Sequence, residues 1–181
     1  MNEKDTALII IDVQYFYFPG GALSLNNPEQ TAENIKKILT KFRSEKKTVI
    51  HIRHNSKKGG EIYKLLTPLK NEKVISKNFA NSFKDTDLLS HLKKNGISRL
   101  VVTGMQTHMC VEAAVRAAAD YGFKCIVISD GCTTRDLKFN GKITEAGDVH
   151  NSTLSTLSGT YAEITDTANY LKNKLDTSIQ Q

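Results

Sequence analysis

The sequence lacks the features that stabilise secreted proteins or anchor membrane proteins. Its 181 residues include only three cysteines, Cys110, Cys125 and Cys132, with no Cys-x-x-Cys pair. Such a set argues against a disulfide framework and for a reducing compartment. The longest apolar run, Ala7 to Ile11, is too short to cross a bilayer, and the N-terminus has no signal-peptide pattern. We therefore expect a cytoplasmic protein with no membrane partner.

Two classes of ligand are disfavoured by missing motifs. The net charge is +6, but the lysines are spread along the chain, without a dense basic block, a zinc-finger spacing or an aromatic-rich RNA motif. We expect a solvated basic surface and no nucleic-acid partner. The segment after the first predicted strand reads DVQYFYFPGG and contains no GxGxxG. This absence argues against a flavodoxin-like protein that binds nucleotides or flavin.

Short apolar strands alternate with amphipathic helices along the chain. The alternation predicts right-handed crossovers and a mostly parallel α/β sheet of about six strands, covered by helices on both faces. Strands are predicted at 7–13, 48–52, 73–76, 100–103, 124–129 and near 161–164. Helices are predicted at 34–47, 85–96, 110–122, 146–157 and after Thr165. The segments 15–27, 55–71 and 131–142 are expected to be long loops around a site.

Cys110 is the most informative cysteine. The predicted strand before it ends at Gly104, and a helical pattern that stops at Gly122 starts near Cys110. Unpaired N–H groups and the positive end of a helix favour a thiolate over a thiol in the first turn. We therefore expect Cys110 to be a nucleophile with a lowered pKa.

Chemically complementary groups follow other predicted strands. Asp12 ends the first strand and Lys77 the third, and the carboxyl ends of parallel strands form the binding edge of such sheets. Asp12 can take the proton of Cys110, while Lys77 would lower the thiol pKa. The backbone N–H groups of Gln106 and Cys110 are candidates for an oxyanion hole. Together these groups predict acyl transfer to water through a thioester.

Four segments, ALIIIDVQ, FPGGAL, VISKNFANSF and VTGMQTHMCVEAAVRAA, resemble the isochorismatase-like cysteine hydrolases. The resemblance extends from Ala7 to about residue 171, and implies a single domain over residues 1–181 with a three-layer α/β/α sandwich. It further implies that Asp12, Lys77 and Cys110 form a catalytic triad. A cis peptide bond at Met105–Gln106 and a homo-oligomer are also implied.

The same resemblance narrows the reaction. Family members that cleave the vinyl ether of isochorismate lack the cysteine, so its presence favours a small amide substrate. Nicotinamidases of the family bind a metal through an Asp-x-His element, whereas this chain reads HIRHNSKKGGE there. We accordingly expect neither a metal nor another cofactor. The substrate-binding residues are expected to be Gln14, Phe16, Phe79, Phe83 and His108.

Two other interpretations remain open at this point. The chain could be a non-catalytic binding or scaffold member of the same fold, or an isochorismatase-type hydrolase that acts on another bond. Each residue also has a structural alternative. Cys110 could be a buried core thiol, Asp12 a helix cap and Lys77 a surface lysine, and Phe83 could belong to the core.

Overall fold

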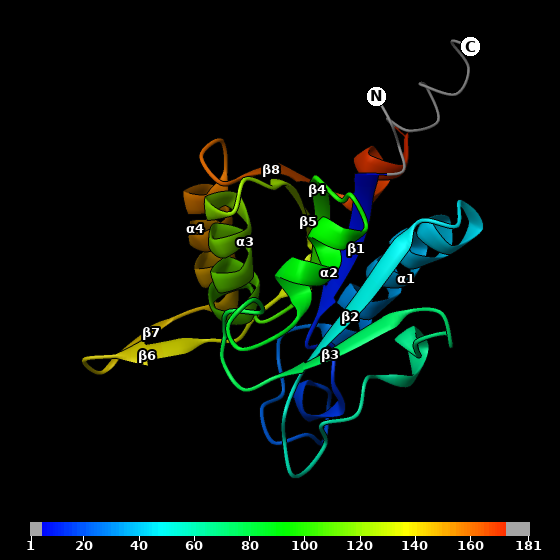
Figure 1. Ribbon diagram of the computed structural model, residues 1–181. Coiled ribbons are helices and arrows are strands. Elements are labelled where there is room, and N and C mark those ends of the chain that lie inside the picture. The colour runs from blue at the N-terminus through cyan, green and yellow to red at the C-terminus, as the bar shows by residue number, and fades with distance from the viewer. Residues whose placement is uncertain (1–4, 173–181) are drawn as a thin grey trace.

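A six-stranded parallel sheet forms the centre of the molecule in the computed structural model, which describes residues 5–172 (Figure 1). The strand order is β3-β2-β1-β4-β5-β8, and every neighbouring pair is parallel. The strands are β1 (Thr6–Ile11), β2 (Thr48–His54), β3 (Lys73–Lys77), β4 (Arg99–Met105), β5 (Lys124–Thr133) and β8 (Ala162–Thr165). The predicted α/β fold class is confirmed.

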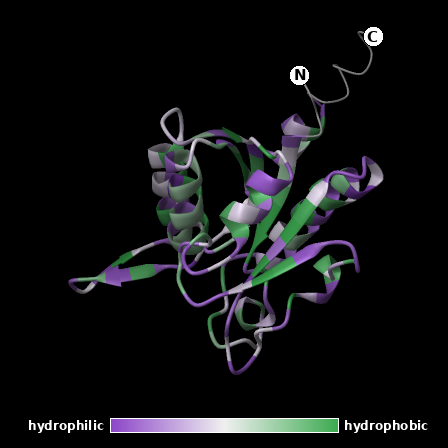
Figure 2. Ribbon diagram, viewed as in Figure 1, coloured by the Kyte–Doolittle hydropathy of each residue, from purple (hydrophilic) through white to green (hydrophobic). Residues whose placement is uncertain are grey.

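Helices cover both faces of this sheet because its strands are apolar on both sides. Ala7, Ile9 and Ile11 of β1 belong to one core, which α2 (Leu88–Lys94), α3 (Glu112–Asp120) and α4 (Ala146–Leu157) complete. Leu8 and Ile10 point into a second core against α1 (Pro28–Ser44). Figure 2 shows the resulting apolar colouring through the central strands. Two cores separated by one sheet make the predicted three-layer sandwich.

Some element boundaries differ from those predicted. Helix α1 begins at Pro28, six residues before the predicted start, since proline suits the first helical turn. Short helices η2 (Tyr15–Tyr17) and η3 (Lys64–Leu66) lie within the first two predicted loops. Within residues 5–172, no helix combines the length and the hydropathy needed to cross a membrane.

The third predicted loop contains a hairpin. Strands β6 (Leu137–Phe139) and β7 (Lys142–Thr144) pair antiparallel and project from the body of the molecule (Figure 1). The turn between them is Asn140-Gly141, and both residues have positive φ. An Asn-Gly pair is the preferred sequence for a two-residue hairpin turn. The signal was therefore present in the sequence, although the prediction of a loop missed it.

Gly104 allows β4 to pass very close to β1 at the edge where the predicted site residues gather. Its φ is +135°, and a Cβ atom placed there would lie 2.0 Å from the backbone oxygen of Ile11. No side chain fits such a gap, because the obstructing atom belongs to the backbone of a central strand. Glycine at this position is therefore a requirement of strand packing.

Gly104→Ala is expected to lower the free energy of unfolding on the order of 4 kcal/mol or more, through backbone strain and the clash with Ile11. Gly122→Ala is the matched control. Gly122 also has positive φ, but a Cβ there meets nothing within 4 Å. Its expected loss is about 1–2 kcal/mol, from backbone strain alone. Urea denaturation measures both values, and equal losses would contradict the role given to Gly104.

Candidate active site

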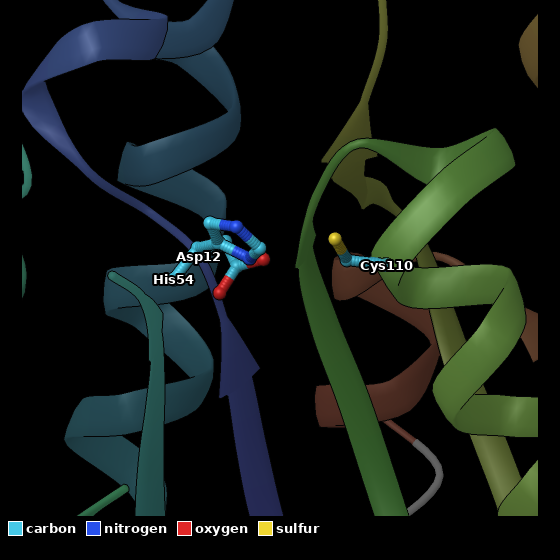
Figure 3. Close-up of side chains that lie close together, drawn as sticks. All are labelled: Asp12, His54 and Cys110. Carbon is cyan, nitrogen blue, oxygen red and sulfur yellow. The ribbon is translucent and has the colours of Figure 1, made fainter. Parts of the chain in front are cut away.

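Four neighbouring strands bring the site residues to one edge of the sheet. Lys77 and His54 are the last residues of β3 and β2, and Asp12 directly follows β1. Asp12 has φ +53°, a left-handed conformation that aspartate tolerates better than most residues. Its backbone N–H donates to the carbonyl of Ile52 at 2.9 Å, which ties this turn to β2. Cys110 follows β4 and faces Asp12 and His54 in Figure 3.

The ammonium group of Lys77 lies at the centre of this cluster. Its Nζ is 2.7 Å from Oδ2 of Asp12, 3.3 Å from Sγ of Cys110 and 3.4 Å from Nδ1 of His54. Asp12 is fully buried and Lys77 is 1% exposed, so water does not screen their ion pair. Removing one partner of such a pair typically destabilises a protein by about 3–5 kcal/mol. The structure thus brings together the three residues that the sequence predicted as a triad.

The protonation state of Cys110 differs from the prediction. Burial, followed by the nearby Asp12 carboxylate, raises the pKa of the Cys110 thiol to about 12, although Lys77 opposes this shift. Burial also raises the pKa of Asp12, against the opposing charge of Lys77. The expected lowering of the cysteine pKa was wrong because it neglected desolvation. This shift favours the thiol form of Cys110 over the thiolate.

Cys110 belongs to a π-helical turn, η4 (Thr107–Val111), which precedes α3. The N–H of Val111 donates to the carbonyl of Gln106 at 3.3 Å, the five-residue spacing of a π-helix. The peptide bond between Met105 and Gln106 is cis. The predicted helix therefore starts with a wider turn, and this turn carries Cys110.

A cavity of about 370 Å³ opens beside the sulfur of Cys110. Its walls are mostly apolar, with a few polar groups. The lining residues are Phe16, Tyr17, Ala22, Leu23, His54, Asn55, Ser56, Lys58, Ala80, Gln106, Met109, Cys110 and Arg135. Nε of Arg135 donates to Oε1 of Gln106 at 3.2 Å, and Nε2 of Gln106 donates to the hydroxyl of Tyr17 at 3.4 Å. A largely apolar cavity with a few converging polar groups is typical of a small-molecule site.

Two of the predicted substrate-binding residues have structural contacts instead. Gln14 is fully buried and hydrogen-bonds the backbone of His54 and Gly60. Phe83 packs against Tyr121 and Phe123 in the core between the sheet and α3. Both residues were assigned to the pocket from their position in the sequence, which does not show the direction of a side chain.

The remaining three predicted wall residues differ in their positions. Phe16 lines the cavity, as expected. Phe79 is 40% exposed, lies under the ammonium of Lys84 and is not among the residues that line the cavity. His108 hydrogen-bonds Thr134, and burial lowers its pKa. Neither Phe79 nor His108 is a direct wall residue in this arrangement.

Sequence reasoning missed several cavity residues, chiefly Tyr17, Met109 and Arg135. Met109 adjoins Cys110, and Arg135 follows the fifth strand in the segment DGCTTRD. These residues follow the ends of predicted strands, and that position in the sequence could have identified them as candidates for the cavity wall. Asp130 of the same segment has a structural role. Its carboxylate accepts hydrogen bonds from the backbone N–H and the hydroxyl of Thr167, and these bonds fix the backbone near the sheet edge.

The two strand-two histidines do not form a joint metal site. Residues three apart in a strand face opposite sides, and His51 accordingly pairs with Glu72 away from the cavity, at 3.0 Å. Ligand-type atoms of Asp12, His54 and Cys110 do lie within 4.8 Å of one another. However, the ammonium of Lys77 is within hydrogen-bond distance of all three groups. A metal ion would fit here only if Lys77 moved away.

The fold and this cluster define an α/β protein with a cysteine, a carboxylate and a lysine at the carboxyl edge of a parallel sheet. A family model for the isochorismatase domain matches residues 6–169. The chain therefore belongs to the isochorismatase family and is a hydrolase of that family.

Three comparisons illustrate this membership. YddQ, an isochorismatase family protein of Bacillus subtilis, is 40% identical over 178 residues, covering 92% of this chain and 99% of YddQ. Nicotinamidase 3 of Arabidopsis thaliana is 23% identical over 188 residues, covering 91% of this chain and 86% of the plant protein. The crystal structure of an isochorismatase hydrolase from Oleispira antarctica has a TM-score of 0.90 and 36% identity, covering 95% and 98% of the two chains.

Asp12→Asn is expected to increase the rate at which iodoacetamide alkylates Cys110 at pH 8–9. The reason is that the Asp12 carboxylate raises the pKa of this thiol, and its removal leaves the attraction of Lys77 unopposed. Adding Lys77→Met to Asp12→Asn should slow alkylation again. Mass spectrometry of the Cys110 peptide measures each rate, and circular dichroism verifies folding. An unchanged or slower rate in Asp12→Asn would contradict this electrostatic account.

Proposed function

We propose that the chain is a single-domain cysteine hydrolase that cleaves a small amide through a thioester, with Asp12, Lys77 and Cys110 as its catalytic triad. The observation that carries this proposal is the buried contact of one ammonium with both a carboxylate and a thiol. A thiol whose proton can pass to an adjacent carboxylate is the arrangement that nucleophilic catalysis requires.

The first half-reaction acylates the cysteine. Asp12 accepts the proton of the Cys110 thiol, and the sulfur attacks the substrate carbonyl carbon to form a C–S bond. The carbonyl oxygen becomes an oxyanion, for which the backbone N–H groups of Gln106 and Cys110 are the proposed donors. When the oxyanion collapses, the C–N bond breaks and the leaving nitrogen takes the proton from Asp12. Ammonia or an amine leaves, and a thioester remains.

The second half-reaction hydrolyses this thioester. Water attacks the acyl carbon while Asp12 accepts a proton from it, and collapse of the new intermediate breaks the C–S bond. The carboxylic acid departs, and the proton on Asp12 returns to the Cys110 sulfur. Lys77 stabilises the negative charge that passes between carboxylate and thiolate in both halves. Every step uses groups of this chain, the substrate and water.

The size and lining of the cavity suit a small acyl group that is planar or apolar. Phe16, Tyr17 and Met109 provide apolar walls, while Arg135 and Gln106 provide polar groups. An amide substrate agrees with the similarity to a nicotinamidase, although that relative shares only 23% identity. The size of the amides that such a cavity accepts is limited mainly by its volume of about 370 Å³.

Cys110→Ala is expected to reduce ammonia release from an accepted amide by on the order of 10⁴-fold or more, the scale of losing a catalytic nucleophile. Cys125→Ala is the matched control, since Cys125 is a buried strand cysteine outside the cavity. A panel of small primary amides and a coupled ammonia assay provide the measurement. Rapid acid quenching and mass spectrometry should detect the acyl group on Cys110.

The outcomes separate the alternative functions. Full hydrolysis by Cys110→Ala would contradict covalent catalysis and favour the isochorismatase-type reaction on another bond. Absence of both ammonia release and acylation across the panel would favour a non-catalytic member of the fold.

We further propose that the protein acts in the cytoplasm as a homo-oligomer. Cys110, Cys125 and Cys132 are free thiols, a state that a reducing compartment maintains. The β6–β7 hairpin carries Phe139, 79% exposed, and Ile143, 67% exposed. An isolated two-stranded hairpin is marginally stable in water, so these side chains favour a contact with a second copy of the chain.

Phe139→Glu combined with Ile143→Glu is expected to shift the protein toward monomer by replacing apolar contact area with charge. Lys138→Glu is the control, because it adds one negative charge to the same hairpin without removing an apolar side chain. Size-exclusion chromatography with light scattering gives the mass in solution. A monomeric native protein, or an oligomer unaffected by the double substitution, would contradict this proposal.

A further inference from the structure

The Lys77 ammonium has three hydrogen-bond donors, and the structure places three acceptors around it. Three is the full number of hydrogen-bond donors of an ammonium group, which has no acceptor atom. Two acceptors belong to Asp12 and Cys110, and the third is Nδ1 of His54 at 3.4 Å. We propose that His54 is a positioning residue that orients Lys77 toward Asp12 and Cys110. The catalytic consequence rests on the function proposed above.

The sheet topology explains why a residue of β2 can take this role. Strand β2 lies between β3, which carries Lys77, and β1, which leads to Asp12. His54 is the register partner of Lys77. Figure 3 shows the imidazole ring beside the Asp12 carboxylate, with the Cys110 sulfur across from them. The ring therefore borders the space in which the ammonium must be held.

Gln14 fixes the backbone of His54 from both directions. Its Oε1 accepts the N–H of His54 at 2.8 Å, and its Nε2 donates to the carbonyl of His54 at 2.9 Å. The same Nε2 donates to the carbonyl of Gly60 at 2.6 Å. Because Gln14 is fully buried, water does not compete for these bonds. Gln14 thus supports the cluster by fixing the backbone of His54. This role explains why an amide side chain is buried close to Asp12.

The contact also selects one tautomer of the ring. Lys77 offers only N–H donors to Nδ1, so Nδ1 must be the unprotonated acceptor and Nε2 must carry the hydrogen. Among residues 5–172, none hydrogen-bonds Nε2, and His54 lines the cavity beside Cys110. His54 therefore presents an Nε2–H donor in the cavity wall, available to an acceptor atom of the substrate.

The tautomer can be measured directly on the native protein. Long-range ¹H–¹⁵N correlation spectra distinguish a protonated from an unprotonated ring nitrogen, and comparison with His54→Gln assigns the His54 signals. We expect the Nε2–H form at pH 8. Lys77→Met should weaken this preference, because the donor facing Nδ1 is lost. A His54 ring protonated at Nδ1 in the native protein would overturn the proposal.

Two amide substitutions test which ring nitrogen matters. The oxygen of His54→Asn lies near the position of Nδ1, whereas the amide of His54→Gln lies near Nε2. We expect iodoacetamide to alkylate Cys110 at a near-native rate in His54→Asn. The rate should fall about tenfold in His54→Gln and His54→Leu, the order expected for one hydrogen bond to a charged group. The alkylation rates are measured at pH 9 by mass spectrometry of the Cys110 peptide.

His91→Leu is the control, since His91 lies on α2 and does not line the cavity. Native-like rates in all His54 variants, or equal losses in His54→Asn and His54→Gln, would contradict the positioning role. If His54→Leu fails to fold, the tautomer of the native protein still decides the question. Neither measurement needs a substrate. Failure of the amide panel would therefore reject the proposed hydrolase without affecting His54, and a wrong tautomer would reject only the role of His54.

Discussion

The buried ion pair between Lys77 and Asp12 is the interaction on which the rest of the site depends. Both charges have left water, so each requires the other as its partner. The ammonium on β3 obtains its acceptors from the end of β2, from the residue after β1 and from the turn after β4. Such a cluster forms only when β3, β2, β1 and β4 lie side by side in the order observed. The site therefore depends on the correct assembly of four of the six strands.

Desolvation decides the resting chemistry of this cluster. The same burial that strengthens the ion pair raises the pKa of Cys110 to about 12, which favours the protonated sulfur. The thiolate, which is the reactive form of a cysteine, is disfavoured there until the charge balance changes. Under the proposed mechanism, attack on the substrate carbonyl provides that change, because the oxyanion takes up negative charge that the thiolate would otherwise retain. Asp12, whose pKa burial also raises, is well suited to hold the proton meanwhile.

Loops around the Lys77 cluster form much of the wall of the cavity. Phe16 and Tyr17 come from the segment after β1, His54 from the end of β2, and Arg135 from the segment after β5. Hydrogen bonds from Arg135 to Gln106 and from Gln106 to Tyr17 join two of these segments through the residue that follows β4. Residues far apart in the sequence thus determine the shape and polarity of the cavity together. The cluster around Lys77 and the cavity differ in this respect, since strand ends position most of the cluster and loops supply much of the cavity wall.

Local patterns in the sequence determined the strands, most of the helices and the three residues at the strand ends. Ala7 to Ile11, for example, predicts a strand buried on both faces, and the position of Asp12, Lys77 and Cys110 after strands follows from the same reading. Tertiary structure alone decided the direction and burial of each side chain. It turned Gln14 toward His54, placed Phe83 in the core and surrounded Cys110 closely enough to raise its pKa. Periodicity shows which residues leave water, but desolvation and hydrogen-bond partners depend on atoms contributed by distant parts of the chain.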